Sequence, residues 1–581
     1  MQDKKGPSVS DPPLPITRGN GITPQEFTSL PLPCQLEVLL NTRGQERLRY
    51  LSLSSDPQQL VRRLPALEVF LTIKEVGASE ALDLISLTTP EQLQCLLDLD
   101  LWKGDCLDPE RVLSWLSILL ECGEEKINQF LRSTDPEFLG WLCKKFLRIS
   151  KVDPDLPSPP TDPSSFTLDG VYFISFCSQE AREILQPFLQ AFYYLDAHFC
   201  RTILEASLWE LETGLEEMEY RWRSGRLADM GFPELEEATK IYAFIDPDSI
   251  SRQELGGTEV SLSEPTEAPA PTFYLALQPP GSLLTALLRR ITDPWEQDRL
   301  KREIAHLCNC AIVAEPLNQL NIAGMERVAT KVFHYLDLGL QYASGGKEGK
   351  AAELLRSLPL RLLFQCGFST TLLLRRRARS LLQGPWLGND RRNLVFLDHP
   401  YREKLEGMLR KRPLFYRGDR YDDFHDLRDL REAEDTLRCL AVVLRATGEW
   451  LQVFPEQLRT MALQDCFPSE WQEIKLSTIF LTATANFLLY GALAWQPIPL
   501  ARIWDLLDRF LTYPEKGEAT VQEEVRAQVE EWSSSVVQTE DLPFLLEFWD
   551  FCFHLFQEEY GHIPPHEPID PRFVRGLLLS C

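Results

Sequence analysis

The sequence repeats one short signal, in which threonine or aspartate precedes a proline and an apolar residue follows the proline by three positions. The side-chain oxygen of the first residue can accept a hydrogen bond from a free N–H in the first turn of a helix. Proline is favoured next, because its fixed φ suits a helix and because an N–H there would have no partner. The apolar residue then begins a buried face. Each copy therefore predicts a helix start, and five copies occur early in the chain, at Thr23-Pro24, Asp56-Pro57, Thr89-Pro90, Asp108-Pro109 and Asp135-Pro136.

Three of these helix starts are evenly spaced. Pro24, Pro57 and Pro90 lie 33 residues apart, a period typical of one helical hairpin per repeat. The other two starts break the period, and further copies of the signal occur near residues 246 and 570. We therefore predict stacked helical hairpins for residues 22–149 only.

Proline-rich segments divide the rest of the chain. Residues 1–21 are polar and rich in proline, and we expect a disordered tail there. The segment SKVDPDLPSPPTDPSS at 150–165 predicts a linker. Residues 166–581 should then form a second, larger helical domain, interrupted by a flexible acidic loop at 251–271.

Two short segments in that larger domain are rich in β-branched and aromatic residues. Residues 171–176 (VYFISF) and 273–277 (FYLAL) therefore predict strands. Because isolated short strands are marginal, we expect the two to pair. The remaining pattern is helical. The predicted fold class is thus mainly α, with N-terminal helical-hairpin repeats followed by a larger α-helical C-terminal unit with a minimal two-stranded sheet.

The charge balance restricts the partners of the chain. It contains 86 acidic and 60 basic residues among 581, and its net charge is −26. Nucleic acids and anionic membranes should repel such a chain unless it has a local basic patch. The fourteen cysteines are scattered without a CxxC pair, and the first residues contain no apolar segment typical of a secretion signal. These features favour free thiols in the cytoplasm.

One segment contains no charged residue. Residues 476–501 are long enough to span a membrane. However, Asn486 and several serines and threonines dilute the apolar run, and no basic cluster flanks it. We therefore expect residues 476–495 to form a buried helix at the centre of the C-terminal unit, and a membrane span is the alternative.

Three segments have a more specific pattern: RLADMGFPELEEATKIYAFIDPD at 226–248, RRNLVFLDHPYREKLEGMLRKRPLFYRG at 391–418 and IDPRFVRGLLL at 569–579. They resemble an uncharacterised bacterial protein family that is known only as a domain of unknown function. The resemblance implies a mostly helical bacterial protein. It transfers no site residue to this chain, because the family has no known activity.

A basic stretch provides the strongest candidate site. Residues 361–420 contain fourteen lysines and arginines against five acidic residues, with aromatic residues interleaved. Arginines beside aromatic rings can bind phosphates and stack on bases. We expect pairing with the acidic segment 422–435 to neutralise most of this charge, and polyanion binding, to a nucleic acid or a phosphate ligand, is the alternative. The candidate residues are Arg375, Arg376, Arg377, Arg379, Arg391, Arg392, Arg410, Lys411 and Arg412.

A possible metal site lies near the C-terminus. His554 and Glu558 are four residues apart on a predicted helix, and His562 follows. A histidine and a carboxylate at this spacing share one helix face and could bind a divalent metal. The segment lacks the HExxH pattern of zinc hydrolases, so a chance cluster is the simpler interpretation.

Two further segments place imidazole beside carboxylate. Asp398 precedes His399, and His425 lies between Asp423 and Asp426. Such pairs can serve general acid–base catalysis. Residues adjacent in a helix do not face each other, so a solvent-exposed charged face is the simpler interpretation.

A turn rich in arginine and tryptophan is a candidate interface. Trp222, Arg223 and Arg226 lie in the segment YRWRSGR, and both residue types are enriched in interface hot spots. The alternative is that Trp222 belongs to the core and that the arginines cap helix carbonyls.

No common catalytic motif is present. The sequence contains no GxxxxGK[ST] loop, no GxGxxG after a predicted strand and no GxSxG elbow. Helical repeats most often bind other proteins. The leading hypothesis is therefore a non-catalytic cytoplasmic interaction or scaffold protein. The alternatives are polyanion binding through 361–420 and a metal-dependent enzyme using His554 and Glu558. Cofactors, partner identity and oligomeric state stay open.

Overall fold

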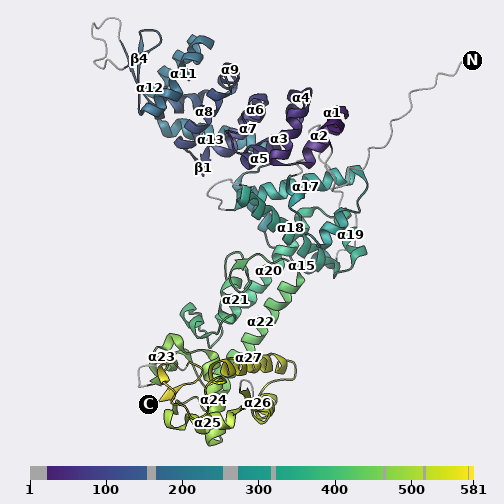
Figure 1. Cartoon of the computed structure of the whole chain (residues 1–581), viewed down its shortest axis with the longest axis vertical. Helices are drawn as coiled ribbons and strands as arrows, with labels where there is room; N and C mark the ends of the chain where they lie inside the picture. The colour runs from purple at the N-terminus through teal and green to yellow at the C-terminus, as the bar shows by residue number, and fades with distance from the viewer. Residues whose placement is uncertain are drawn as a thin grey trace, which may run out of the picture. The chain divides into compact units, whose positions relative to one another are not determined.

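The chain folds mainly into helices, which confirms the predicted fold class (Figure 1). Its sheets contain only two or three short strands each. The structure is a computed structural model that describes residues 23–152, 165–252, 273–315, 322–461, 466–513, 519–573 and 575–580. The predicted tail at 1–21 and most of the predicted linker and acidic loop lie outside these residues.

The chain forms two compact units whose segments alternate along the sequence. The first unit comprises Met1–Thr239, Ser261–Gln278 and Asp293–Ala329. The second comprises Lys240–Val260, Pro279–Thr292 and Thr330–Cys581. Neither unit is a continuous stretch of chain, in contrast to the consecutive domains expected from the sequence.

All five predicted helix starts begin helices in the first unit. In four of them the Thr or Asp side chain accepts a hydrogen bond from the first turn, as the signal requires. Asp135 makes no such bond, because its carboxylate pairs with Arg226 instead. The five helices are α1 (Pro24–Ser29), α4 (Pro57–Arg63), α7 (Pro90–Asp100), α8 (Pro109–Glu121) and α10 (Pro136–Phe146).

The 33-residue period contains three helices, and the prediction of one hairpin per period is wrong. Each helix from α1 to α7 packs on the helix two positions further along the chain, so that odd-numbered and even-numbered helices form two layers. Because a period holds an odd number of helices, equivalent helices of successive periods lie in alternate layers. The helices between the predicted starts are α2 (Leu32–Asn41), α3 (Gly44–Leu53), α5 (Ala66–Val76), α6 (Leu82–Leu87) and α9 (Glu124–Ser133).

Buried polar side chains hold these layers together at the helix ends. Gln35 donates to two carbonyl oxygens at the end of α1, at 3.0 and 3.1 Å. Gln92 does the same at the end of α4, at 2.7 and 2.8 Å. Lys126 donates to the Thr88 carbonyl just after α6, at 2.8 Å. These bonds pair helix-terminal carbonyls that would otherwise be buried without a donor.

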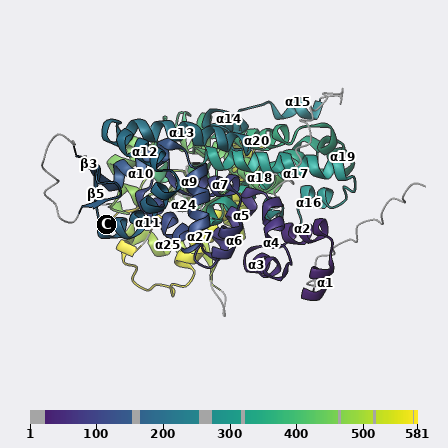
Figure 2. The same cartoon turned by 90° about the horizontal axis from the view of Figure 1, so that it is seen from above.

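The first unit continues with two small sheets and five further helices. Helix α10 packs on α12 and α13, α11 packs on α12, and α13 also packs on α7 (Figure 2). The helices are α11 (Gln179–Leu195), α12 (Ala197–Trp209), α13 (Glu212–Asp229), α14 (Leu235–Thr239) and α17 (Pro294–Ala314). The strands are β1 (Trp102–Lys103), β2 (Cys106–Leu107), β3 (Leu147–Lys151), β4 (Phe166–Thr167) and β5 (Tyr172–Phe176).

The predicted strand at 171–176 exists, but its predicted partner is wrong. β5 pairs in antiparallel register with β3 and β4, and residues 273–277 form a 3-10 helix. There the Phe273 N–H donates to the Glu68 carboxylate at 2.8 Å, and the buried Tyr274 hydroxyl donates to Asn309 at 2.7 Å. Because β3 and β5 flank the predicted linker and pair with each other, residues 150–165 do not divide the two units.

The second unit contains both short helices and the 23-residue helix α20 (Leu360–Leu382). Its helices are α15 (Pro247–Arg252), α16 (Leu283–Leu288), α19 (Glu348–Ser357), α20 (Leu360–Leu382), α21 (Tyr401–Met408), α22 (Leu427–Arg445), α23 (Pro455–Met461), α24 (Leu476–Tyr490), α25 (Ile503–Phe510), α26 (Glu523–Val536) and α27 (Leu542–Tyr560), with α18 (Ile322–Ser344) spanning the boundary. Its strands are β6 (Phe415–Tyr416), β7 (Tyr421–Asp422), β8 (Cys466–Phe467), β9 (Ile498–Pro499), β10 (Leu511–Thr512), β11 (Thr520–Val521) and β12 (Leu579–Ser580).

The charge-free segment forms α24, which packs against α25, α27 and β9. Residues 476–486 are buried, and their polar groups are bonded: Thr482 accepts from the Leu578 N–H at 2.9 Å, and Asn486 donates to the Ala494 and Gln496 carbonyls. The helix is shorter than predicted, because Gly491 ends it in the left-handed region at φ 74°. None of the described helices has the length and apolar character needed to cross a membrane.

Two glycines allow α18 and α20 to cross closely. A β-carbon added at Gly339 would lie 2.8 Å from the Gly367 nitrogen and 2.9 Å from the Leu363 carbonyl carbon. The reciprocal addition at Gly367 would lie 2.8 Å from the Gly339 nitrogen. Only glycine fits this crossing, which holds the helix that contains much of the basic stretch.

Candidate functional sites

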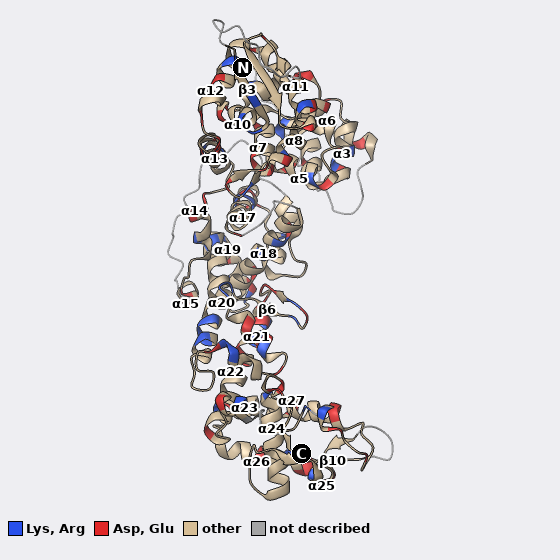
Figure 3. Ribbon diagram, turned by 90° about the vertical axis from the view of Figure 1, so that its left-hand side faces the viewer, with Lys and Arg blue, Asp and Glu red and all other residues tan. Residues whose placement is uncertain are grey.

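Several of the predicted basic residues are neutralised within the second unit. Figure 3 shows lysine and arginine segments on α20, α21 and α22 with acidic segments between them. Arg377 on α20 pairs with Glu434 on α22 at 2.8 Å, inside the acidic segment predicted as the partner. Arg392 pairs with its neighbour Asp390 at 2.9 Å. Lys411 is exposed.

Aromatic rings cover three more of these arginines. The guanidinium of Arg376 lies 3.9 Å from the centre of the Phe244 ring. Arg410 lies 3.9 Å from the ring of Tyr421. Arg412 lies 4.1 Å from the ring of Tyr242. These cation–π contacts are internal to the unit and occupy the rings on which a nucleobase could have stacked.

Three arginines of the stretch have no such partner. Arg375 and Arg379 are one turn apart on α20, and Arg391 begins the 3-10 helix Arg391–Phe396. Within the described residues, no ion pair and no side-chain hydrogen bond involves Arg375, Arg379 or Arg391. Burial, together with the charges of Arg379 and Arg391, lowers the pKa of Arg375. The three side chains therefore form a like-charge cluster.

Asp398 and His399 have different partners, and the His425 imidazole lies 3.5 Å from the Asp422 carboxylate. Asp398 is buried and accepts from the Ser477 N–H at 3.0 Å and from its hydroxyl, whereas His399 lies 3.2 Å from Glu403. Burial raises the pKa of Asp398 to about 6, against the lowering by its bonds to Ser477.

The second histidine segment forms a different contact. His425 stacks on His334 with ring centres 3.8 Å apart. Burial and the neighbouring His425 lower the pKa of His334 to about 4, and burial and Arg417 lower the pKa of His425. Both shifts favour the neutral form of the imidazole.

Two of the predicted metal residues, His554 and Glu558, lie on one exposed face of α27, and His562 follows the end of that helix. The His554 and Glu558 side chains approach to 3.5 Å, and both are more than 60% exposed. The His562 ring lies 3.2 Å from the Glu558 carbonyl oxygen. Within the part of the chain that the structure describes, no three His, Cys, Asp or Glu side chains gather so that they could bind a metal ion.

The predicted interface residues divide between the interior and the surface of the first unit. Arg226 donates to both Asp98 carboxylate oxygens and to Glu219, each at 2.8 Å. Arg223 donates to the Asp98 carbonyl at 2.7 Å. Both arginines therefore hold α13 on α7, and only Trp222 points outward, with 52% of its surface exposed.

Trp222 belongs to an apolar row that the sequence analysis missed. Leu211 just before α13 is 74% exposed, and Met218 on the helix is 41% exposed. The intervals of seven and four residues between Leu211, Met218 and Trp222 place all three on one helix face. Beside this row, Gly214 and Gly225 face open space. We call Leu211, Gly214, Met218, Trp222 and Gly225 the α13 face.

The α13 face lies in the region with the densest exposed apolar residues. Among the described residues, six of the thirteen large apolar side chains that are exposed fall between positions 194 and 222. The others are spread over the rest of the chain, so this concentration distinguishes α11 to α13 from other surfaces. The six are Tyr194, Trp209, Leu211, Met218, Tyr220 and Trp222.

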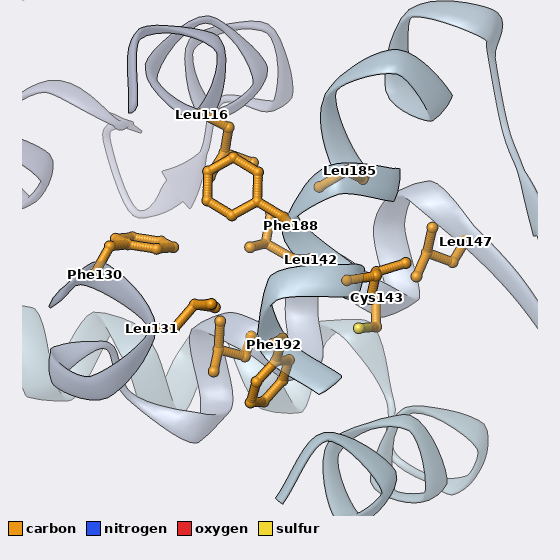
Figure 4. Close-up of a pocket in the computed structure, with 11 residues that line it drawn as sticks. Leu116, Phe130, Leu131, Leu142, Cys143, Leu147, Leu185, Phe188 and Phe192 are labelled. Atoms are coloured by element: carbon orange, nitrogen blue, oxygen red, sulfur yellow. The ribbon is translucent and has the colours of Figure 1, made fainter. Parts of the chain in front are cut away.

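The cavities of the two units differ in size and lining. The first unit contains an apolar cavity of about 30 Å³ between α8, α9, α10 and α11, lined by Phe130 and Phe188 among others (Figure 4). That volume is small for an organic ligand. The second unit has an open cleft of about 580 Å³ between α21, α22 and α27. Its lining mixes both charges, and Lys404 and Glu432 pair across it at 2.7 Å.

Comparison with known proteins identifies a family but no activity. No curated protein and no solved structure matches the chain. A family model described as "Family of unknown function (DUF6178)" matches residues 24–580. The match covers nearly the whole chain, includes both compact units and confirms the resemblance to a family without known activity. The chain belongs to this family of unknown function.

Proposed function

We propose that this chain is a non-catalytic protein-binding protein of the cytoplasm, and that it binds a partner helix on the α13 face. The observation behind the proposal is the exposed apolar row of Leu211, Met218 and Trp222. A helix normally buries its apolar face. Helix α13 buries Leu215, Glu219 and Leu227 on the side that adjoins this row, yet the three side chains of the row stay largely exposed. The exposed parts of Leu211, Met218 and Trp222 therefore form an apolar surface that remains available to a partner.

The dimensions of the face favour a helix as the partner. Leu211 and Trp222 are eleven residues apart, so the row extends over about 16 Å, or three helical turns. A β-carbon added at Gly214 or at Gly225 would meet no atom within 4 Å, so a partner backbone can approach closely beside the row. An amphipathic helix with apolar residues at i, i+4 and i+7 matches this shape.

Charge does not obstruct this contact. Glu217 and Arg221 beside the row pair with each other at 2.5 Å, and both are more than 60% exposed. The row is thus flanked by a neutral pair. Exposed Trp and Met are residue types enriched at the centres of protein interfaces.

The test uses the full chain, tagged and crosslinked in the cells that make it. Met218→Asp places a charge in the middle of the row, at a side chain that is 41% exposed. Phe573→Asp is the matched control, because Phe573 is 78% exposed and lies in the second unit. We expect one crosslinked protein to be at least tenfold depleted by M218D and unchanged by F573D. Equal depletion by both variants, or no crosslinked protein with the unmodified chain, would contradict the proposal.

A further inference from the structure

We propose that Arg375, Arg379 and Arg391 form a binding site for a compact phosphate-bearing anion. The site lies in the second unit and is independent of the α13 face. It accounts for three arginines of the basic stretch that find no acidic partner among the described residues.

The backbone brings the three arginines together at the end of α20. Arg375 and Arg379 share a helix face at a spacing of four residues. The chain then turns back: the Gly388 N–H donates to the Gly384 carbonyl, and the Asn389 N–H donates to the Leu382 carbonyl, both at 2.8 Å. These bonds fix the loop, which returns the chain to the last turn of α20 just before Arg391.

The cluster is unfavourable unless an anion occupies it. The Nε of Arg375 is shielded from solvent and has no hydrogen-bond acceptor among the described residues. Like charges one helical turn apart repel each other, and the lowered pKa of Arg375 reflects its burial and this repulsion. Because Arg375 as a whole is only half-buried, a small turn of its guanidinium would present this unpaired donor to a ligand oxygen.

The helix dipole explains only part of the arrangement. The negative end of α20 favours a cation in its last turn, where Arg379 lies. Arg375 is a further turn away from that end, and Arg391 belongs to another helix. The neighbouring carboxylate of Asp390 does not neutralise them, because it pairs with Arg392 and lies 3.8 Å from Arg459.

Phosphate is the anion that this arrangement fits best. Arginine presents a planar fork of N–H donors that matches phosphate oxygens. A long polyanion is disfavoured, because the net charge of the chain is −26. Base stacking is also disfavoured, because Tyr421 and Tyr242 lie under arginines and Trp386 is buried.

The test is calorimetric titration of the full chain with inorganic pyrophosphate, in low salt and at constant ionic strength. Arg379→Gln and Arg391→Gln remove one charge each from the cluster. Arg392→Gln is the matched control, because it removes the same charge from an arginine that already has a carboxylate partner. We expect the pyrophosphate dissociation constant to rise at least tenfold in R379Q and in R391Q, and less than twofold in R392Q. Equal weakening in all three variants, or no binding by the unmodified chain, would overturn the proposal.

Two further measurements separate a ligand site from a structural role and from nucleic-acid binding. Without ligand, R391Q should melt at the same temperature as the unmodified chain or higher, because it relieves repulsion, and a lower melting temperature would overturn the proposal. A single-stranded oligonucleotide should bind more weakly than pyrophosphate. Tighter binding of the oligonucleotide with the same arginine dependence would also overturn the compact-anion assignment.

Discussion

Replacing Gly339 with alanine should destabilise the second unit, because α18 and α20 cross at this position. The new methyl group would lie 2.8 Å from the Gly367 nitrogen, whereas ordinary contact begins at about 3.4 Å. The obstacle is backbone rather than a flexible side chain, so the two helices must separate. Overpacking of this kind costs up to about 3 kcal/mol. Alanine recovers about 1 kcal/mol through its higher helix propensity, which leaves a net loss of about 2 kcal/mol.

Gly349 provides a control with the opposite expected sign. It lies in α19 of the same unit, and a β-carbon there would meet no atom within 4 Å. Gly349→Ala should therefore stabilise the unit by up to about 1 kcal/mol. Urea unfolding of the full chain, followed by tryptophan fluorescence, would compare the midpoints of the two variants. A G339A midpoint at or above that of the unmodified chain would refute the close crossing of α18 and α20.

Three further predictions concern buried charges and their partners. Arg226→Ala should destabilise the first unit by about 3 kcal/mol, because the buried Asp98 carboxylate loses its cation. Thermal unfolding should show a smaller loss, under about 0.5 kcal/mol, for Arg221→Ala, whose ion pair is exposed. Burial raises the pKa of Glu219 from 4.5 to about 8, although Arg226 acts to lower it. The Glu219 carboxyl therefore binds its proton more tightly in the folded unit than in the unfolded chain. The stability of the unit should fall as the pH rises from about 4.5 to about 8. Glu219→Gln should flatten this dependence in unfolding curves measured at several pH values, and an unchanged slope would contradict the assignment. Ser477→Ala removes one donor from the buried Asp398 carboxylate and should cost about 2 kcal/mol, measured by urea unfolding against the exposed Ser535→Ala.

Helix starts could be predicted from the sequence because capping is a local interaction. The Thr or Asp, the proline and the free N–H groups lie within one turn, so tertiary structure seldom alters the outcome. Asp135 shows the limit: its helix begins as predicted, but the carboxylate bonds to Arg226, which is 91 residues away in the sequence. The prediction that residues 273–277 form a paired strand was wrong because distant residues determine their structure. Residues 273–277 bond to the buried Glu68 and Asn309, and their own sequence contains no information about these partners.

The candidate sites were less predictable because they depend on exposure. The spacing of Leu211, Met218 and Trp222 indicates one helix face, but residue type alone suggests that such a face is buried. For the basic stretch, the sequence correctly indicated an acidic partner segment, and Glu434 in that segment does pair with Arg377. The sequence could not indicate which arginines would have no acidic partner among the described residues, because the position of Arg391 depends on how the loop after α20 turns back.

The alternation of the two units along the chain constrains the order in which they can fold during synthesis. The first unit needs residues up to Ala329, so it cannot be complete until more than half of the chain has left the ribosome. By then the segments Lys240–Val260 and Pro279–Thr292 have already emerged, although the unit to which they belong needs residues beyond Thr330. These two segments cannot pack into the second unit until residues beyond Thr330 have been synthesised. A chain whose synthesis stops soon after Thr292 would therefore expose surfaces that the finished protein buries.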